Sequence, residues 1–375
     1  MDRNQLKTSG RWVIKIGSAV LTNDGLGLDL DRIRCWVTDI AALRDSGHQV
    51  VLVSSGAVAE GLVRLGWTSR PKTVHELQAA AAVGQTGLVQ AYETEFAEYQ
   101  VRTAQILLTA DDLSDRQRYL NARSSIQELI KLGVVPIINE NDTVGTEEIR
   151  FGDNDTLAGL VCNLVDADRF VILTDRDGLY DADPELNKNA KLVSTANSGD
   201  KNLEEMAGTS AGALGRGGMA TKLKAAALAA RSGASCLIAN GRESQIISRL
   251  AAGENLGTLL LAGTTPVGAR KQWLAGQLQV KGSLTLDQGA AKVLCESGRS
   301  LLPVGVTSIS GNFVRGELVS CINEDGRELA RGLVNFNAED ANKIIGKPSA
   351  QISSILGYCD DEEIIHRDNL VLTSA

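Results

Sequence analysis

The chain has 375 residues and a formal net charge of −8; 43% of its residues are hydrophobic and only 4% are aromatic. This length exceeds what one ordinary core requires and predicts one large and one small domain, while the negative charge argues against a general nucleic-acid-binding surface. The polar N-terminal segment, and the lack of any run of about 18 apolar residues, predict a cytoplasmic protein and exclude a membrane-spanning one.

Short β-branched runs alternate with stretches of helical periodicity through the first 262 residues. The strands are expected at residues 12–16, 50–53, 105–108, 134–138, 170–173 and 236–239, and helices are expected at 31–45, 116–132 and 220–232. This alternation is typical of an α/β fold with a mostly parallel sheet covered by helices.

The pattern changes after about residue 262. A polar stretch leads into short alternating runs separated by glycines, which predicts a domain boundary. We therefore expect a catalytic domain at 1–262, a linker at 263–280, a small β-rich domain at 281–360 and a C-terminal tail at 361–375.

Two small turns follow the first two expected strands. Lys15 lies at the end of the first strand and is followed by Ile16, Gly17 and Ser18; the second strand ends in Ser54-Ser55-Gly56. Ligands bind at the carboxyl ends of strands in open α/β sheets, and amides at a helix start can face an anion. Taken alone, the first turn is better explained by a solvated lysine, and the second could be no more than a serine N-cap. Two such turns on neighbouring strands make a functional site a competitive interpretation.

Polar clusters follow the fourth and fifth strands. Asn139-Glu140-Asn141-Asp142 is followed a dozen residues later by Asp153-Asn154-Asp155 before a helix. Asn and Asp are common in turns, but these two clusters carry more carboxylate and amide groups than turn formation requires. They could bind an amino acid's ammonium group and orient lysines. Thr174-Asp175, after the fifth strand, is by itself ordinary turn chemistry.

A glycine-rich segment, GRGGMATK at residues 215–222, leads into an alanine-rich helix. Glycine amides, a hydroxyl group and Lys222 converge there on a helix N-terminus, which is typical of a phosphate-binding site. The segment also satisfies G-x-G-x-x-A, but no strand precedes it, so the dinucleotide-binding reading lacks its context.

Cysteines and histidines limit the remaining chemistry. The six cysteines are scattered without C-x-x-C spacing and are interpreted as reduced core residues. None of the three histidines lies near a second ligand-type residue at metal spacing, so we expect no zinc site and no metal-ligating residues. A divalent cation held by carboxylates and phosphates stays open.

The motifs VIKIGSAVLT, VSSGAVAEG, PIINENDTV, FGDNDTLA, LTDRDGLY and GRGGMATKL, in this order, resemble the glutamate 5-kinases of the amino-acid kinase family. The pair IINEND and GDND is the most discriminating part. The segment LLPVGVTSISGNFVRGE resembles the PUA module that many bacterial members carry. The resemblance implies a three-layer α/β sandwich with a mostly parallel central sheet, followed by a small β-rich PUA-like barrel.

The resemblance also implies an activity: transfer of a phosphoryl group from ATP, with Mg²⁺, to the side-chain carboxylate of L-glutamate, the first step of proline biosynthesis. It further implies feedback inhibition by proline, a homotetramer or homodimer, and hand-off of the product to glutamyl phosphate reductase.

Residue by residue, the matching motifs imply three groups of site residues. The catalytic residues are Lys15, Lys222 and Asp155, and the glutamate-binding residues are Ser55, Asp142 and Asn154. Arg216 stands where threonine is common in the family, so only its backbone contact is implied. The ATP-binding residues are Lys15, Thr174, Asp175, Arg216, Gly217, Gly218, Met219, Ala220, Thr221 and Lys222.

Three alternatives stay open. The chain could be another amino-acid kinase, acting on aspartate, N-acetylglutamate, carbamate or a nucleoside monophosphate, although the pairing of IINEND with a PUA-like C-terminal segment disfavours this. It could be an RNA-binding or RNA-modifying PUA protein, but residues 281–359 contain eight Lys plus Arg and eight Asp plus Glu, which gives no electrostatic footprint for RNA. It could also be an inactive regulatory protein, which the presence of Lys15, Asp155 and Lys222 disfavours.

Overall fold

The computed structural model describes residues 3–22, 27–145, 154–184, 186–207, 218–263, 280–359 and 361–373. The chain divides into two compact units, one of Met1–Ser114 with Asn121–Val267 and one of Asp115–Leu120 with Gly268–Ala375. Each unit has its own cluster of buried apolar residues. The predicted linker at 263–280 lies outside the described residues except for its two end residues.

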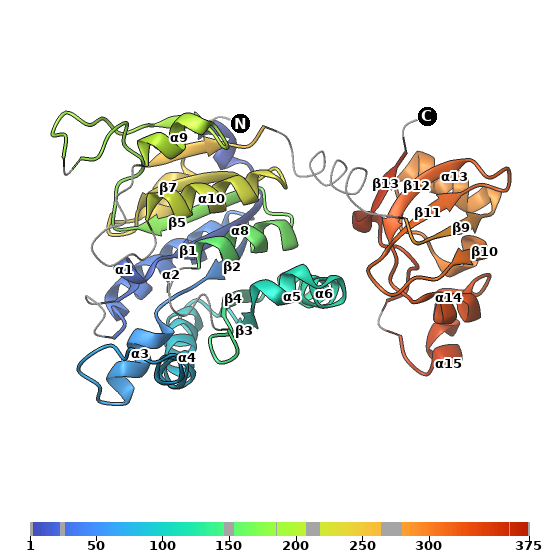
Figure 1. The fold of residues 1–375 in the computed structure, drawn as a ribbon, viewed down its shortest axis with the longest axis horizontal. Coiled ribbons are helices and arrows are strands. Elements are labelled where there is room, and N and C mark those ends of the chain that lie inside the picture. The colour runs from blue at the N-terminus through green and yellow to red at the C-terminus, as the bar shows by residue number, and fades with distance from the viewer. Residues whose placement is uncertain are drawn as a thin grey trace. The chain divides into compact units, whose positions relative to one another are not determined.

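The first unit is built on an eight-stranded sheet (Figure 1). Every neighbouring pair in it is parallel except β7 with β8, which is antiparallel. The predicted mostly parallel sheet and all six predicted strands are confirmed. In spatial order the strands are β3 (Thr103–Leu108), β4 (Val135–Glu140), β2 (Gln49–Val53), β1 (Arg11–Ile16), β5 (Arg169–Thr174), β7 (Ser235–Asn240), β8 (Thr258–Leu261) and β6 (Thr195–Asn197).

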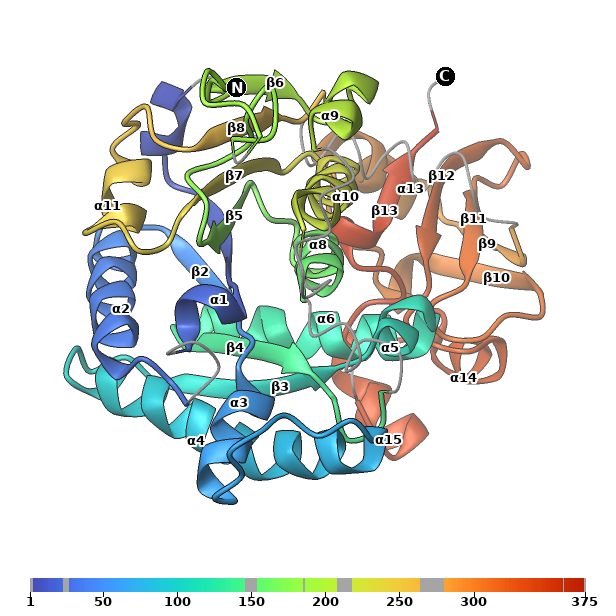
Figure 2. The same ribbon diagram turned by 60° about the vertical axis from the view of Figure 1, so that its left-hand side comes forward.

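Helices cover both faces of this sheet, which gives three layers (Figure 2). Helices α2 (Leu30–Asp45), α4 (Val74–Ala97) and α11 (Ile246–Ala251) share a core with one face. Helices α8 (Asp155–Leu164) and α10 (Met219–Ala230) pack together on the other. The remaining helical segments are η1 (Arg3–Lys7), α1 (Ser18–Leu21), α3 (Ala57–Arg64), α5 (Ala110–Ser114), α6 (Arg116–Lys131) and α9 (Lys201–Met206). Residues 116–120 of α6 are grouped with the second unit.

Strand β1 decides which side chains face which helices. Its residues Trp12, Ile14 and Ile16 are fully buried in the core shared with α2, α4 and α11. Because side chains alternate along a strand, Lys15 is directed to the opposite face, where α8 and α10 lie. The mostly apolar strand β1 thus places Lys15 beside the N-termini of the helices in that layer.

The order of the strands brings several strand ends together. β1 is central, with β2 and then β4 on one side and β5 on the other. Because these strands are parallel, their carboxyl ends meet at one edge of the sheet, where ligands bind in open α/β folds.

The second unit contains a five-stranded sheet, as predicted for a β-rich module. Its core includes Leu284, Phe313, Val319 and Phe336. The strands, in spatial order, are β10 (Val306–Gly311), β9 (Gly282–Leu286), β11 (Leu318–Ile322), β12 (Glu328–Leu333) and β13 (Leu370–Leu372). Its helical segments are α13 (Gln288–Ser297), η2 (Pro303–Gly305), α14 (Ala338–Ile344), η3 (Ser349–Gln351), α15 (Ile352–Leu356) and η4 (Arg367–Asn369).

The segment 361–375, expected to be a C-terminal tail, contributes to this unit. β13 pairs antiparallel with β12, and Ile364 and Ile365 are fully buried in the core. The expectation followed the end of the glycine-separated pattern and overlooked the short apolar run Leu370-Val371-Leu372.

The cysteines are only partly the core residues that were expected. All six are free; Cys162, Cys236 and Cys321 are buried, but Cys35, Cys295 and Cys359 are exposed. Cys35 occupies the polar face of the amphipathic helix α2, which the apolar neighbourhood in the sequence did not reveal.

Across the described residues, no helix combines the length and apolar character needed to cross a membrane.

Candidate active site

A buried carboxylate joins two lysines at the carboxyl edge of the sheet. Asp155, the first residue of α8, has no exposed surface and forms an ion pair with the ammonium group of Lys15. Its Oδ2 also lies 3.1 Å from Nζ of Lys222 and accepts a hydrogen bond of 2.9 Å from Oγ1 of Thr221. The two lysines are only 3% and 5% exposed. Three predicted site residues far apart in the sequence are thus in direct contact.

Electrostatics keep Asp155 ionised. Burial alone would raise the pKa of this carboxyl group, but the charges of Lys15 and Lys222 and the hydrogen bonds from Lys15 and Thr221 outweigh it, so the pKa lies well below its usual value. The two ammonium groups that contact this carboxylate place positive charge at this edge of the sheet, which suits an anionic ligand.

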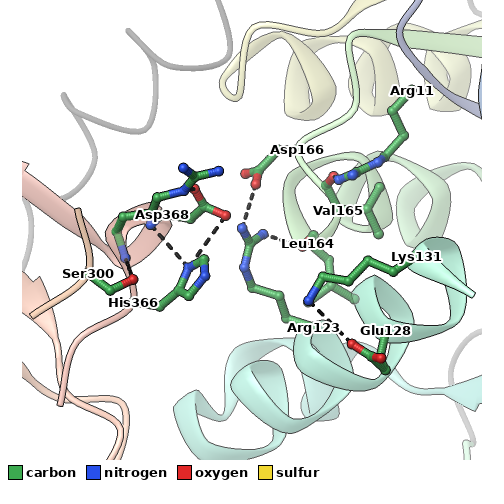
Figure 3. A network of polar contacts seen from close by, with 11 residues as sticks. Arg11, Arg123, Glu128, Lys131, Leu164, Val165, Asp166, Ser300, His366 and Asp368 are labelled. Carbon is green, nitrogen blue, oxygen red and sulfur yellow. Dashed lines mark hydrogen bonds and ion pairs between the residues drawn. The ribbon is translucent and has the colours of Figure 1, made fainter. Parts of the chain in front are cut away.

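Helix α8, which carries Asp155, is also held at its other end (Figure 3). Arg123 is 3% exposed; its Nη1 donates to the carbonyl oxygen of Leu164 at 2.5 Å and its Nη2 contacts Asp166 at 2.5 Å. Arg11 donates to the carbonyl oxygen of Val165. Cations at a helix C-terminus pair with carbonyl groups that have no partner within the helix, and here they fix the helix that positions Asp155.

A glycine keeps space open beside Lys15. The amide of Gly17 donates to the carbonyl oxygen of Leu173 at 3.0 Å, which ties the turn after β1 to β5. A Cβ atom on Gly17 would lie 3.2 Å from that carbonyl oxygen and 3.8 Å from Nζ of Lys15. Any side chain at this position would therefore crowd the space that a phosphate could occupy.

Amide side chains form a second cluster after β2 and β4. Nδ2 of Asn154 donates to the carbonyl oxygen of Ser54 and to Oδ1 of Asn139, both at 2.6 Å, and Nδ2 of Asn139 donates to Oε1 of Gln85 at 2.7 Å. Oγ of Ser55 is buried and has no hydrogen-bond partner among the described residues. A buried hydroxyl group without a partner is costly, so the cluster is suited to receive a polar ligand.

The end of β5 supplies a third polar group. Thr174 is buried, and its hydroxyl group donates to Oδ1 of the exposed Asp175 at 3.0 Å. The amide of Gly241 donates to the carbonyl oxygen of Thr174 at 2.8 Å, which joins this turn to the end of β7.

Comparison with known proteins identifies the family. The amino acid kinase family matches residues 10–240, and the PUA domain matches residues 282–356. The first match spans more than half of the 375 residues. The chain belongs to the amino acid kinase family.

Curated relatives refine this assignment. The glutamate 5-kinase of Stutzerimonas stutzeri is 61% identical over 370 residues, which cover 99% of this chain and 100% of the relative. The glutamate 5-kinase of Nitrosococcus oceani is 60% identical, with 99% of each chain covered. The predicted resemblance to glutamate 5-kinases and to a PUA module is confirmed. Among solved structures, UMP kinase from Bacillus anthracis matches with a TM-score of 0.49 and 16% identity, covering 68% of this chain and 97% of that one.

In this member of the amino acid kinase family, the structure describes most of the site residues predicted from the sequence, but not all of them. Ser55 and Asn154 belong to the amide cluster, and Asp142 is half-buried two residues after β4. Gly218 is the N-cap of α10, and Met219, Ala220, Thr221 and Lys222 form its first turn. Arg216 and Gly217 lie outside the described residues.

Two residues that contact this candidate site were not predicted from the sequence. Gln85, in the middle of α4, is tied to Asn139, and the buried hydroxyl group of Tyr92 lies 3.1 Å from Oγ of Ser54. Both come from a helix that had not been predicted, so no local signal connected them to the strand ends. Thr221 was predicted to bind nucleotide, but its hydroxyl group also holds Asp155.

The site fits Mg²⁺ only as a companion of ATP. Within the described parts of the chain, no three His, Cys, Asp or Glu side chains are grouped to hold a metal ion. Asp155 is already engaged by two ammonium groups and a hydroxyl group. Mg²⁺ usually takes one or two carboxylates together with substrate phosphates and waters, so these residues fit an ion that arrives bound to the nucleotide.

Proposed function

We propose that this chain transfers the terminal phosphoryl group of ATP to the side-chain carboxylate of L-glutamate, producing L-glutamyl 5-phosphate for proline biosynthesis. The observation that carries the proposal is the contact of Asp155 with both Lys15 and Lys222. It is supported by relatives about 60% identical over the full chain that are named glutamate 5-kinase.

The nucleophile needs no general base. A glutamate side chain has a pKa near about 4.3, so it is already a carboxylate at neutral pH. The barrier is instead the approach of one anion to another. In the transition state, charge spreads over the oxygens of the transferred group, and positioned cations and amide donors stabilise it.

Lys15 and Lys222 are the cations assigned to this task. Asp155 holds both, and the glycine amides of the turn after β1 and the N-terminus of α10 add donors without charge. Mg²⁺ enters with ATP and would neutralise phosphate charge. Thr174, Asp175 and the segment 216–222 are assigned to the nucleotide.

The amide cluster is assigned to glutamate. Ser55, Asp142 and Asn154 combine a hydroxyl group, a carboxylate and an amide, which suits a ligand that carries both an ammonium group and carboxylates. This cluster lies after β2 and β4, whereas Thr174 lies after β5. The central strand β1, with Lys15 at its end, separates them, so the two substrates would meet at Lys15.

Regulation and partners complete the proposal. Proline carries an α-carboxylate and an ammonium group like glutamate, so we infer that it inhibits at the glutamate pocket. The product is an acyl phosphate, which water hydrolyses readily, so transfer to glutamyl phosphate reductase in the cytoplasm would protect it. We also infer a homo-oligomer, a dimer or a tetramer.

A coupled assay of ADP release tests the reaction. Turnover should require glutamate, ATP and Mg²⁺, and should be far slower with aspartate, N-acetylglutamate or UMP. Trapping the product with hydroxylamine would give the γ-hydroxamate of glutamate. Equal or faster turnover with another acceptor would overturn the proposal.

A further inference from the structure

Three amide side chains form a continuous hydrogen-bonded chain beside the proposed glutamate pocket. Asn154 donates to Asn139, and Asn139 donates to Gln85. Their exposed fractions are 6%, 1% and 8%, so water cannot substitute freely for these contacts. Neither Gln85 nor Asn139 is among the residues that the family motifs assign to a substrate.

Backbone groups fix which atom donates and which accepts in each of these amide hydrogen bonds. Oδ1 of Asn139 accepts a hydrogen bond of 2.9 Å from the amide of Glu140, which can only donate. Nδ2 of Asn139 must therefore be the donor toward Gln85. At the other end, Nδ2 of Asn154 donates to the carbonyl oxygen of Ser54, which can only accept. Each amide has one permitted orientation.

The fixed direction decides what Asn154 offers to a ligand. Both protons of its amide nitrogen are used, one by Ser54 and one by Asn139. The remaining polar atom is Oδ1, which accepts hydrogen bonds and cannot donate them. An oxygen acceptor suits the α-ammonium group of an amino acid and disfavours a carboxylate.

Gln85 is the last of the three hydrogen-bonded amides, and only one of its two polar atoms has a partner among the described residues. Its Oε1 holds Asn139, but its Nε2 is buried without a hydrogen-bond partner in the described part of the chain. A buried donor without a partner is destabilising, so packing alone favours an apolar residue here. The contribution that offsets this cost is the contact between Oε1 and Asn139.

We propose that Gln85 is a positioning residue for recognition of the substrate's α-ammonium group. It holds Asn139, which holds Asn154 with its oxygen available to the ammonium group. The proposal rests on the proposed function, because it assumes that Asn154 belongs to the glutamate pocket. Gln85 need not touch the substrate; it acts through two other side chains.

The test uses Gln85→Met, which keeps the length of the side chain and removes its oxygen. L-Glutamate is compared with glutarate, which has both carboxylates and no amino group. The Kd for glutamate should rise about tenfold, as expected when an orienting hydrogen bond to a buried polar group is lost. The Kd for glutarate should change by less than about twofold, so the preference for glutamate over glutarate falls about tenfold.

Two further variants sharpen the test. Gln85→Glu restores an acceptor for Asn139, so it should return the preference to within about twofold of wild type, even if its charge shifts both constants together. Gln90→Met changes an exposed glutamine of the same helix and should alter neither constant. If Gln85→Met does not fold, Gln85→Leu is measured in its place.

The outcomes separate this proposal from the proposed reaction. A loss of preference in Gln85→Met that Gln85→Glu restores supports the positioning role. Equal rises for glutamate and glutarate, an unchanged preference, or no restoration by Gln85→Glu would overturn it. Because calorimetry measures both constants without turnover, a wild-type chain that binds glutamate but releases no ADP would overturn only the proposed reaction.

Discussion

At the scale of single residues, the molecule places charge where water cannot screen it. Asp155 is completely buried and both of its lysine partners are nearly so. Burying charge is costly unless it is paired, and here one buried carboxylate contacts two ammonium groups. In the proposed reaction both ammonium groups would face the charge that develops on the transferred phosphoryl group, so the arrangement would be well matched to the reacting state.

Substitution of either lysine should therefore affect turnover more than binding. We expect Lys15→Ala and Lys222→Ala each to lower kcat by about a hundredfold or more, because each removes a cation from the developing charge. The KM for glutamate should change by no more than a few-fold. Steady-state ADP release measures both parameters. Lys224→Ala, which changes an exposed lysine two residues further along α10, is the control. A near-normal kcat in Lys15→Ala or in Lys222→Ala would remove the substituted lysine from the catalytic group.

The proposed glutamate residues should behave in the opposite way. We expect Asp142→Ala and Asn154→Ala to raise the KM for glutamate about tenfold or more while the KM for ATP stays within about twofold. Proline inhibition should weaken in the same variants, because we place proline in the same pocket. Asp111→Ala, an exposed acid in α5, serves as the control. Weaker ATP binding, with unchanged glutamate binding, would show that the two sites had been assigned wrongly.

At the scale of elements, the crossing of α3 and α4 sets the position of the amide cluster. A Cβ atom on Gly84 would lie 1.9 Å from the carbonyl oxygen of Ala57, and one on Gly61 would lie 1.7 Å from that of Ala80. The two helix backbones are therefore in direct contact. Gly84 precedes Gln85, and Ala57 follows the Ser55-Gly56 turn, so this contact fixes both sides of the cluster.

A methyl group at this crossing should be destabilising. Alanine is favoured over glycine in helices by about 1 kcal/mol, but overpacking against backbone atoms costs about 1–3 kcal/mol. We expect Gly84→Ala to lower the free energy of unfolding and to raise the KM for glutamate. Urea denaturation measures the first effect. In the control, Gly87→Ala, the added atom meets only the flexible guanidinium group of Arg64, so equal losses in both variants would contradict the argument.

The contact between β1 and the turn before β2 should make the free energy of unfolding depend on pH. Nε1 of Trp12 donates to Nδ1 of His48 at 3.0 Å, which requires that nitrogen to be unprotonated. Burial and the charge of Arg169 lower the pKa of His48, and a hydrogen bond with the backbone of Gly10 opposes this shift. The histidine is therefore neutral in the folded state at pH values where it is charged in the unfolded state.

The free energy of unfolding should therefore fall as the pH is lowered. The stability that depends on neutral His48 is present above the unfolded pKa of about 6.5 and is lost as pH falls through the lower folded pKa. Urea denaturation from pH 7.5 to pH 5 should show a falling free energy of unfolding, with a smaller slope in His48→Gln. Parallel slopes for the two proteins would exclude His48 as the source.

The elements could be predicted most readily where their periodicity was strong. The amphipathic helices α2 and α6 and the buried strands gave clear patterns, because one face or both faces are apolar. Helix α4 gave none: its sequence has alanine, glycine and valine on several sides, since α3 and the sheet core both pack against it. For the same reason Gln85 could not be connected to the site from sequence.

At the scale of the whole molecule, the parallel sheet assembles the site from distant segments. Lys15, Asp155 and Lys222 are separated by 140 and 67 residues in the sequence and are in contact in the fold. The resemblance to the family implied these three residues. The fold brings them together because Lys15 lies near the end of β1, and Asp155 and Lys222 lie in the first turns of two helices that pack together. The donor and acceptor directions of the amide cluster could not be predicted, because they depend on backbone groups that only the folded chain brings together.

The part of the second unit that follows Gly263 should be dispensable for the chemistry. Every described residue that we assign to catalysis or to a substrate belongs to the first unit, whose largest core cluster draws only on residues between Leu6 and Leu261. Because a domain with its own core usually folds alone, a chain ending at Gly263 should fold and phosphorylate glutamate with a kcat within about threefold of the full chain. Its sensitivity to proline or its oligomeric state should differ, since an appended module changes an equilibrium only through contacts that differ between states. Glutamate-dependent ADP release and mass in solution, measured on both chains, provide the test. A shortened chain that is folded by circular dichroism yet inactive would mean that the second unit helps to form the active site.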